Sequence, residues 1–203
     1  MRIPPKLQLA AGVIDAAVAS IATFAAGLTA VRLLSEIDLG IYGVFFTAFF
    51  LGSVIVTELV LVPAQVVAVN LPEERRLGIT RKSLALGLAP AVAGTLAAAT
   101  AALLTSDLTS GSVIKALALT AAATIVVSPM QDHVRQLLHI ANRSWHAVIV
   151  SLVQLAGVIA AIALLVSLDV DRAWVPFGSL ATANVLSLFT GLTLTGALRR
   201  TPG

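Results

Sequence analysis

The sequence predicts an all-α, polytopic membrane protein with six transmembrane helices, and two observations carry this prediction. Hydrophobic residues make up 58% of the 203 residues and charged residues only 11%, whereas charged residues make up about a quarter of an ordinary soluble domain. Six stretches also lack Asp, Glu, Lys and Arg altogether. These stretches span residues 16–31, 39–57, 83–106, 116–131, 144–168 and 173–198. At about 1.5 Å per helical residue, each is long enough, or nearly so, to cross a hydrocarbon layer about 30 Å thick.

The first two helices are expected roughly at residues 8–34 and 39–68. A basic N-terminus precedes the first, as in a signal peptide, but Asp15 interrupts the apolar run early. We therefore expect this span to be retained rather than cleaved. Turn-forming residues at 35–40 and 70–78 end the two helices.

The remaining helices follow in the same way. Polar and Gly- or Pro-containing breaks occur at 106–112 and 169–176, where such residues favour turns. We expect helices roughly at 83–105, 112–140, 145–167 and 176–198, with boundary errors of a few residues. Six helices use nearly the whole chain, so residues 1–203 should form a single transmembrane domain.

The positive charges predict the orientation of these helices. Ten of the 13 Lys and Arg residues fall on one side of the zigzag: Arg2, Lys6, Arg75, Arg76, Arg81, Lys82, Arg135, Arg143, Arg199 and Arg200. The other side holds Arg32, Lys115 and Arg172, together with Glu36, Asp38, Asp107, Asp169 and Asp171. Because loops rich in Lys and Arg stay in the cytoplasm, both termini should lie there. The basic loops should face anionic lipids, and we expect no nucleic-acid partner.

Small residues spaced three or four apart mark two of the predicted helices as closely packed. The helix at 83–105 carries Gly87, Ala91, Gly94 and Ala98, and the helix at 145–167 carries Gly157 and Ala161. Within a membrane, such residues let helix backbones approach closely. We interpret them as packing positions.

Two acidic residues fall inside predicted spans. Asp15 lies about seven residues into the first helix, and Glu58 lies late in the second. Because these helices run antiparallel, both carboxyls should lie at a similar depth in the cytoplasmic half. Intramembrane acids often line ion or proton pathways. The alternatives are a proton- or cation-coupling pair, a buried structural pair, or side chains that reach the membrane interface.

Other polar groups predict local contacts. Gln154 and Asn184 lie near mid-membrane, where they either hydrogen-bond across the hairpin of the last two helices, which we favour, or contact substrate. Asp132, Arg135 and His139 are three and then four residues apart, so they share a helix face. Arg135 either binds an anionic headgroup or diphosphate in a bidentate manner, or simply pairs with Asp132.

The sequence gives no sign of an enzyme. It lacks a nucleophile elbow, a phosphate-binding Gly loop and a metal-binding His-Glu helix. His133, His139 and His146 lack the spacing of metal ligands, and we place all three at the water interface. Because the chain has no cysteine, thiolate metal sites are excluded. We expect no catalytic residue, no metal and no cofactor.

Two segments resemble a known family. Residues 29–46 resemble the first external loop of polysaccharide flippases, the lipid-linked oligosaccharide branch of the multidrug/oligosaccharidyl-lipid/polysaccharide flippase superfamily. The matching residues are Ala30, Arg32, Glu36, Asp38, Gly40 and Tyr42. Residues 135–143 are similar to the loop between the fourth and fifth helices of that family.

This resemblance implies transport of a lipid-linked oligosaccharide or polysaccharide precursor in a plasma membrane, most simply the bacterial inner membrane. Arg32 matches the family's arginine, so Arg32 would contact the anionic substrate from outside and Arg135 from the cytoplasm. Asp15 and Glu58 would couple transport to protons or ions. Family members usually have two lobes of helices around a cavity, whereas this chain has one.

We therefore expect a homodimer first, in which two lobes enclose the cavity. A partnership with a second six-helix chain and a truncated, inactive lobe are the alternatives. Two other functions remain open at this point. The chain could be a non-transporting membrane scaffold in a glycan-assembly complex, or an exporter of small solutes.

Overall fold

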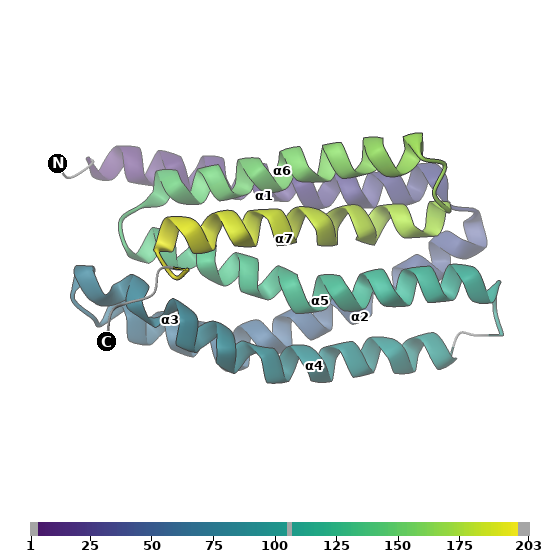
Figure 1. Cartoon of the computed structure of the whole chain (residues 1–203), viewed down its shortest axis with the longest axis horizontal. Helices are drawn as coiled ribbons and strands as arrows, with labels where there is room; N and C mark the ends of the chain where they lie inside the picture. Colours follow the sequence, from purple (N-terminus) through teal and green to yellow (C-terminus); the bar gives the residue numbers. More distant parts are fainter. Residues whose placement is uncertain (1–3, 105–106, 199–203) are drawn as a thin grey trace.

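The computed structural model describes residues 4–104 and 107–198. Across those residues the regular structure is entirely helical, and six helices are long and apolar enough to cross a membrane. The protein is therefore an all-helical, multi-pass membrane protein. Figure 1 shows long helices lying side by side, with α1 beginning and α7 ending at the same end of the bundle.

Each predicted span corresponds to one observed helix or broken helix. α1 covers Pro5–Leu33, α4 Thr80–Leu104, α5 Gly111–Ile140, α6 Ser144–Ser167 and α7 Val175–Thr195. The second span consists of α2 (Glu36–Val56), a π-helical turn η1 (Thr57–Leu61) and α3 (Val62–Val69). Short 3₁₀ turns, η2 (Glu73–Ile79) and η3 (Arg172–Trp174), precede α4 and α7.

The break in the second span has a clear cause in Pro63. Proline has no backbone N–H, and in a regular α-helix its ring would clash with the carbonyl four residues earlier. The chain widens by one residue instead, and the Val62 N–H donates to the Thr57 carbonyl, five residues back. The sequence predicted the extent of this span but missed the π turn.

The last span ends earlier than the predicted boundary of 198. Gly196 adopts a left-handed conformation with φ 77°, which glycine reaches without steric cost. The Ala197 N–H then donates to the Leu192 carbonyl and the Gly196 N–H to the Thr193 carbonyl. These bonds satisfy two of the last four carbonyls of α7, and the helix ends at Thr195.

The order of packing leaves a gap in the bundle. α6 packs against both α1 and α7, α7 packs against α5, and α5 packs against α4 and α2. α2 also packs against α4, whereas the consecutive helices α1 and α2 barely touch each other. One group of helices (α1, α6, α7) therefore meets the other (α2, α4, α5) mainly through α5 and α7 (Figure 1).

Small residues allow these contacts, as the sequence predicts. A Cβ added to Gly94 on α4 would lie 2.9 Å from Ile125 Cγ2 and 3.5 Å from the Gly52 Cα on α2. A Cβ added to Gly157 on α6 would lie 3.2 Å from the Ala183 Cα on α7. Any larger residue at these positions would push neighbouring helices apart.

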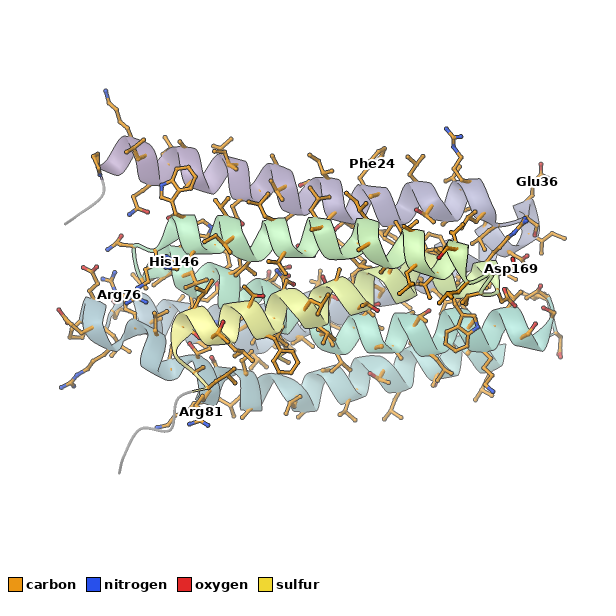
Figure 2. All side chains as sticks on the ribbon, turned by 45° about the horizontal axis from the view of Figure 1, so that its top comes forward. Phe24, Glu36, Arg76, Arg81, His146 and Asp169 are labelled. Atoms are coloured by element: carbon orange, nitrogen blue, oxygen red, sulfur yellow. The ribbon has the colours of Figure 1, made fainter. Side chains whose placement is uncertain are left out.

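Charged side chains separate toward the two ends of the bundle. Figure 2 shows Arg76, Arg81 and His146 at one end, which we call the basic end, and Glu36 and Asp169 at the other, which we call the acidic end. Arg2, Arg199 and Arg200, which the sequence also assigns to the basic side, lie outside the described residues.

Candidate functional site

A groove runs along the gap between α1 and α2. It encloses a volume of about 1020 Å³, and residues of α5, α6 and α7 form its floor. On the α1 side, small residues line it: Ala16, Ala19, Ser20, Thr23 and Gly27. A Cβ added to Gly27 would meet no atom within 4 Å. The small side chains of α1 thus leave space that the bundle does not fill.

The groove is amphipathic along its length. Its half nearer the acidic end has aromatic walls, formed by Phe24, Tyr42, Phe46, Phe49 and Phe50. Its half nearer the basic end carries the charged lining residues Glu58, Asp132 and Arg135, together with Gln131, while Ser128, Gln154 and Asn184 lie near the middle. Such a groove offers one environment to a polar headgroup and another to an apolar tail.

Asp15 anchors α1 to the floor of this groove. Its side chain is buried, and its carboxylate accepts hydrogen bonds from Ser151 Oγ at 2.5 Å and from His139 Nε2 at 2.8 Å. Arg135 Nη1 lies 3.6 Å from the same carboxylate. Asp15 therefore connects α1 to α5 and α6. A carboxylate buried in a membrane protein needs such partners, because no water solvates it.

Arg135 lies between two carboxylates. Its Nη2 donates to Asp132 Oδ1 at 2.7 Å, and its Nη1 donates to Ser151 Oγ at 3.2 Å. The predicted pairing of Asp132 with Arg135 is therefore present, and the shared helix face of Asp132, Arg135 and His139 is confirmed. Both Asp132 and Arg135 also line the groove, so the ion pair does not remove Arg135 from the site.

The predicted hydrogen bond between α6 and α7 is also present. Gln154 Nε2 donates to Asn184 Oδ1 at 2.7 Å, and Asn184 Nδ2 in turn donates to Ser128 Oγ on α5. All three residues line the groove. The contact thus holds three helices together and also presents polar groups to the cavity.

The prediction that His133 lies at the water interface is wrong. Its side chain is buried, with Nε2 2.7 Å from Ser83 Oγ on α4 and Nδ1 3.3 Å from Gln65 Nε2 on α3. Because Gln65 donates to Nδ1, the ring hydrogen belongs on Nε2, where it donates to Ser83. A polar ring can be buried here because both of its nitrogens have partners.

Glu58 and Asp15 differ in their surroundings. Glu58 is exposed, begins the π turn with Thr57 and lines the groove, whereas Asp15 is buried beside the groove. No hydrogen bond or ion pair joins the two carboxylates among the described residues. Arg135 lines the groove with Glu58 and approaches Asp15, so all three belong to the same half of the bundle.

Arg32 does not join this site. It is exposed in the last turn of α1, and it is absent from the lining of the groove. The structure therefore brings Arg135, Asp15, Gln154 and Asn184 together, with Glu58 across the groove, but leaves Arg32 apart.

Ser151 and His139 contact opposite oxygens of one carboxylate. Ser151 Oγ donates to Asp15 Oδ1, and His139 Nε2 lies 2.8 Å from Asp15 Oδ2. Among the described residues, no three His, Cys, Asp or Glu side chains gather in a way that could hold a metal ion. The Arg135 guanidinium, the Asp132 carboxylate and the amides of Gln154 and Asn184 can bind a polar or charged ligand reversibly.

Sequence reasoning missed Ser151 and Gln131, which contribute to the site. Ser151 lies three residues before Gln154, so a polar face of α6 was visible in the sequence. No comparable signal marked Gln131 or linked Asp15 to His139.

The fold and the groove define a class, a multi-pass helical membrane protein with an intramembrane polar cluster. Comparison with models of protein families, with curated proteins and with solved structures finds no match to this chain.

We predict that Asp15→Asn destabilises the protein by about 3 kcal/mol or more, since it leaves His139 without the carboxylate and Arg135 with Asp132 as its remaining ion-pair partner. Glu58→Gln is the matched control, because Glu58 is exposed, and its effect should stay within about 0.5 kcal/mol. Reversible unfolding in mixed micelles measures both. Equal stability of the two variants would contradict a structural role for Asp15.

Proposed function

We propose that the protein is a six-helix lobe of a membrane transporter that moves a lipid-linked oligosaccharide or polysaccharide precursor across the bilayer. The amphipathic groove between α1 and α2 is the observation that carries this proposal. A lipid-linked glycan combines a polar, anionic headgroup with a long apolar tail. The polar half of the groove fits the headgroup, and the aromatic half fits the apolar tail.

The position of the groove also supports a lipid substrate. α1 and α2 barely touch, so no close helix packing separates the groove from the surrounding lipid along this gap. A lipid tail would enter sideways while its headgroup moves along the polar floor. Arg135 is the only arginine or lysine among the described groove residues, and it would receive the headgroup. In this proposal Arg32 makes an earlier or later contact at the acidic end.

We further propose that the basic end of the bundle faces the cytoplasm of a bacterial cell. The described loops there contain Arg75, Arg76, Arg81 and Lys82, and an excess of Lys and Arg marks cytoplasmic loops. Anionic lipids of the inner leaflet would bind the same residues.

The transporting unit would contain two lobes. The groove of a single lobe has α1 and α2 as walls and α5, α6 and α7 as its floor. A second six-helix lobe would cover the open side opposite this floor. Both α1 and α7 have their chain ends at the basic end, so a twofold axis along the membrane normal can pair two identical chains. A homodimer is the simplest assembly, and a second six-helix chain is the alternative.

Of the two intramembrane acids, Glu58 is the better candidate for coupling transport to protons or cations. Asp15 is engaged by Ser151, His139 and Arg135. Glu58 lines the groove at a π turn, and such turns often mark functional positions in helices. It can exchange a proton or ion without breaking the anchor of α1.

An exporter of small solutes is a second candidate, because the charged residues of the groove favour a cationic solute. Glu58 and Asp132 line the groove against a single cation, Arg135, and the aromatic half could bind an apolar cation by cation–π contacts.

The orientation predicts which loops are reached from outside the cell. The chain has no cysteine, so single cysteines can be introduced at Arg75 and at Asp171 without background. A membrane-impermeant thiol reagent should label only the cysteine at position 171 in intact cells. Labelling of position 75 alone would show the opposite orientation. Equal labelling of positions 75 and 171 would refute the predicted orientation.

Filling the groove should block transport. Gly27→Phe places a ring in the groove, whereas Gly43→Phe adds the same ring to α2 outside the groove, and a Cβ at either glycine is unobstructed. We expect Gly27→Phe to slow flipping about tenfold or more, equivalent to about 1.4 kcal/mol, and Gly43→Phe to have little effect.

The measurement follows a fluorescent polyprenyl-diphosphate sugar across proteoliposome membranes by bleaching from outside. Equal rates for the two variants would contradict transport through the groove, provided that both unfold like the wild type.

The coupling role of Glu58 predicts a change in pH dependence. Glu58 lines the same groove as Asp132 and Arg135. Transport by the wild type should change with pH, and Glu58→Gln should flatten that profile because it cannot exchange a proton. The flipping rate is measured across a pH series. A Glu58→Gln profile that follows the wild type would assign coupling to another group.

A further inference from the structure

One edge of the Arg135 guanidinium is only half occupied. Nη2 donates to Asp132 Oδ1 at 2.7 Å. Nε is buried and has no acceptor among the described residues. In a guanidinium, the Nε–H and one Nη2–H are parallel and form a fork that matches two oxygens of a phosphate or carboxylate. Asp132 thus contacts the guanidinium through Nη2, and the Nε donor of this edge has no acceptor in the described part of the chain.

A second unpaired donor lies on the same face of α5, four residues before Arg135. Gln131 is 1% exposed, lines the groove and precedes Asp132 in the sequence. Its Nε2 lacks an acceptor among the described residues. Buried polar atoms nearly always have partners, so two unpaired donors at one end of a cavity point to a ligand that brings oxygen acceptors. Gln154 Oε1 is unpaired as well, and it could accept a hydroxyl hydrogen from the same ligand.

The two partners of Arg135 differ in how easily they can leave. The side chain of Asp15 is 4% exposed and belongs to the buried anchor on the Nη1 side. The side chain of Asp132 is 55% exposed, while that of Arg135 is 11% exposed. Asp132 can therefore turn away without unpacking the bundle, whereas Asp15 cannot.

We propose that a phosphate or diphosphate group of the substrate lipid binds the Nε–Nη2 edge of Arg135, and that Asp132 occupies this edge when no substrate is bound. This inference rests on the proposed function and names the group of the substrate that the groove recognises. Two phosphate oxygens satisfy both donors of the fork, and a further oxygen can accept from Gln131 Nε2. The aromatic half of the groove holds the apolar tail, so the ligand is a lipid phosphate rather than a free anion.

Asp132 then sets the affinity of the site. Its carboxylate competes with the phosphate for the same donors, and Glu58 and Asp15 add negative charge nearby. Like charges at close range in a weakly screened site oppose binding. Competition by Asp132 keeps the substrate from binding too tightly to be released, as transport requires. Removing this carboxylate should therefore strengthen binding.

The test measures equilibrium binding of a radiolabelled polyprenyl diphosphate to the full-length protein in phosphatidylcholine nanodiscs. We expect Asp132→Asn to bind about tenfold more tightly than the wild type, because one competing negative charge is gone. Arg135→Lys should bind about tenfold more weakly, because an ammonium keeps the charge but loses the fork. Arg143→Lys is the matched control, since Arg143 is exposed and outside the groove lining, and it should bind like the wild type.

The outcomes separate this inference from the proposed function. If the wild type binds the polyprenyl diphosphate but a folded Asp132→Asn variant binds it no more tightly, Asp132 does not compete with the phosphate for Arg135. The inference then fails, and the proposed function stands. If the wild type binds tetraphenylphosphonium and not the diphosphate, the lipid-linked substrate and the inference both fail. Inorganic diphosphate that competes as well as the lipid would overturn the lipid assignment.

Discussion

A buried carboxylate on the first helix determines how this bundle is arranged. Asp15 lies away from water, so it requires hydrogen-bond donors and a positive partner. These come from Ser151 on α6 and from His139 and Arg135 on α5. The anchor holds α1 against α6 and leaves it apart from α2, although α2 follows α1 directly in the chain. The groove forms because α1 packs against α6 and not against α2.

The groove combines rigid and adaptable elements. On one side, glycine-mediated contacts such as Gly52 with Gly94 fix α2 against α4. Nearer the basic end of the same span, the π turn at Thr57–Leu61 includes Glu58 and breaks the regular α-helical hydrogen-bond pattern. Motion of α3 and the basic end of the span about this turn would cost fewer backbone hydrogen bonds than bending α2 elsewhere. The polar groups of the groove thus lie next to the weakest point of a well-packed helix.

Local patterns predicted most of the fold and part of the site. Hydropathy located all six spans, because the thickness of a bilayer fixes how long an apolar helix must be. Spacing on one helix predicted the Asp132–Arg135 pair, and similar depth in one hairpin predicted the Gln154–Asn184 bond. Contacts between distant helices were not predictable. Such contacts depend on how each helix is rotated and on which helices become neighbours. The Asp15–His139 hydrogen bond and the burial of His133 could therefore be found only from the structure.

The account depends on energetic coupling between Asp15 and Arg135, which a double-mutant cycle measures directly. The free energies of unfolding of Asp15→Asn, Arg135→Gln and the double variant would be compared with that of the wild type in the same micelles. We expect the double variant to be more stable than the sum of the single effects implies, by about 1 to 3 kcal/mol, because removal of either partner already removes the attraction between the two. Effects that add within about 0.5 kcal/mol would show that the two residues act independently, and they would contradict an anchor that positions α1.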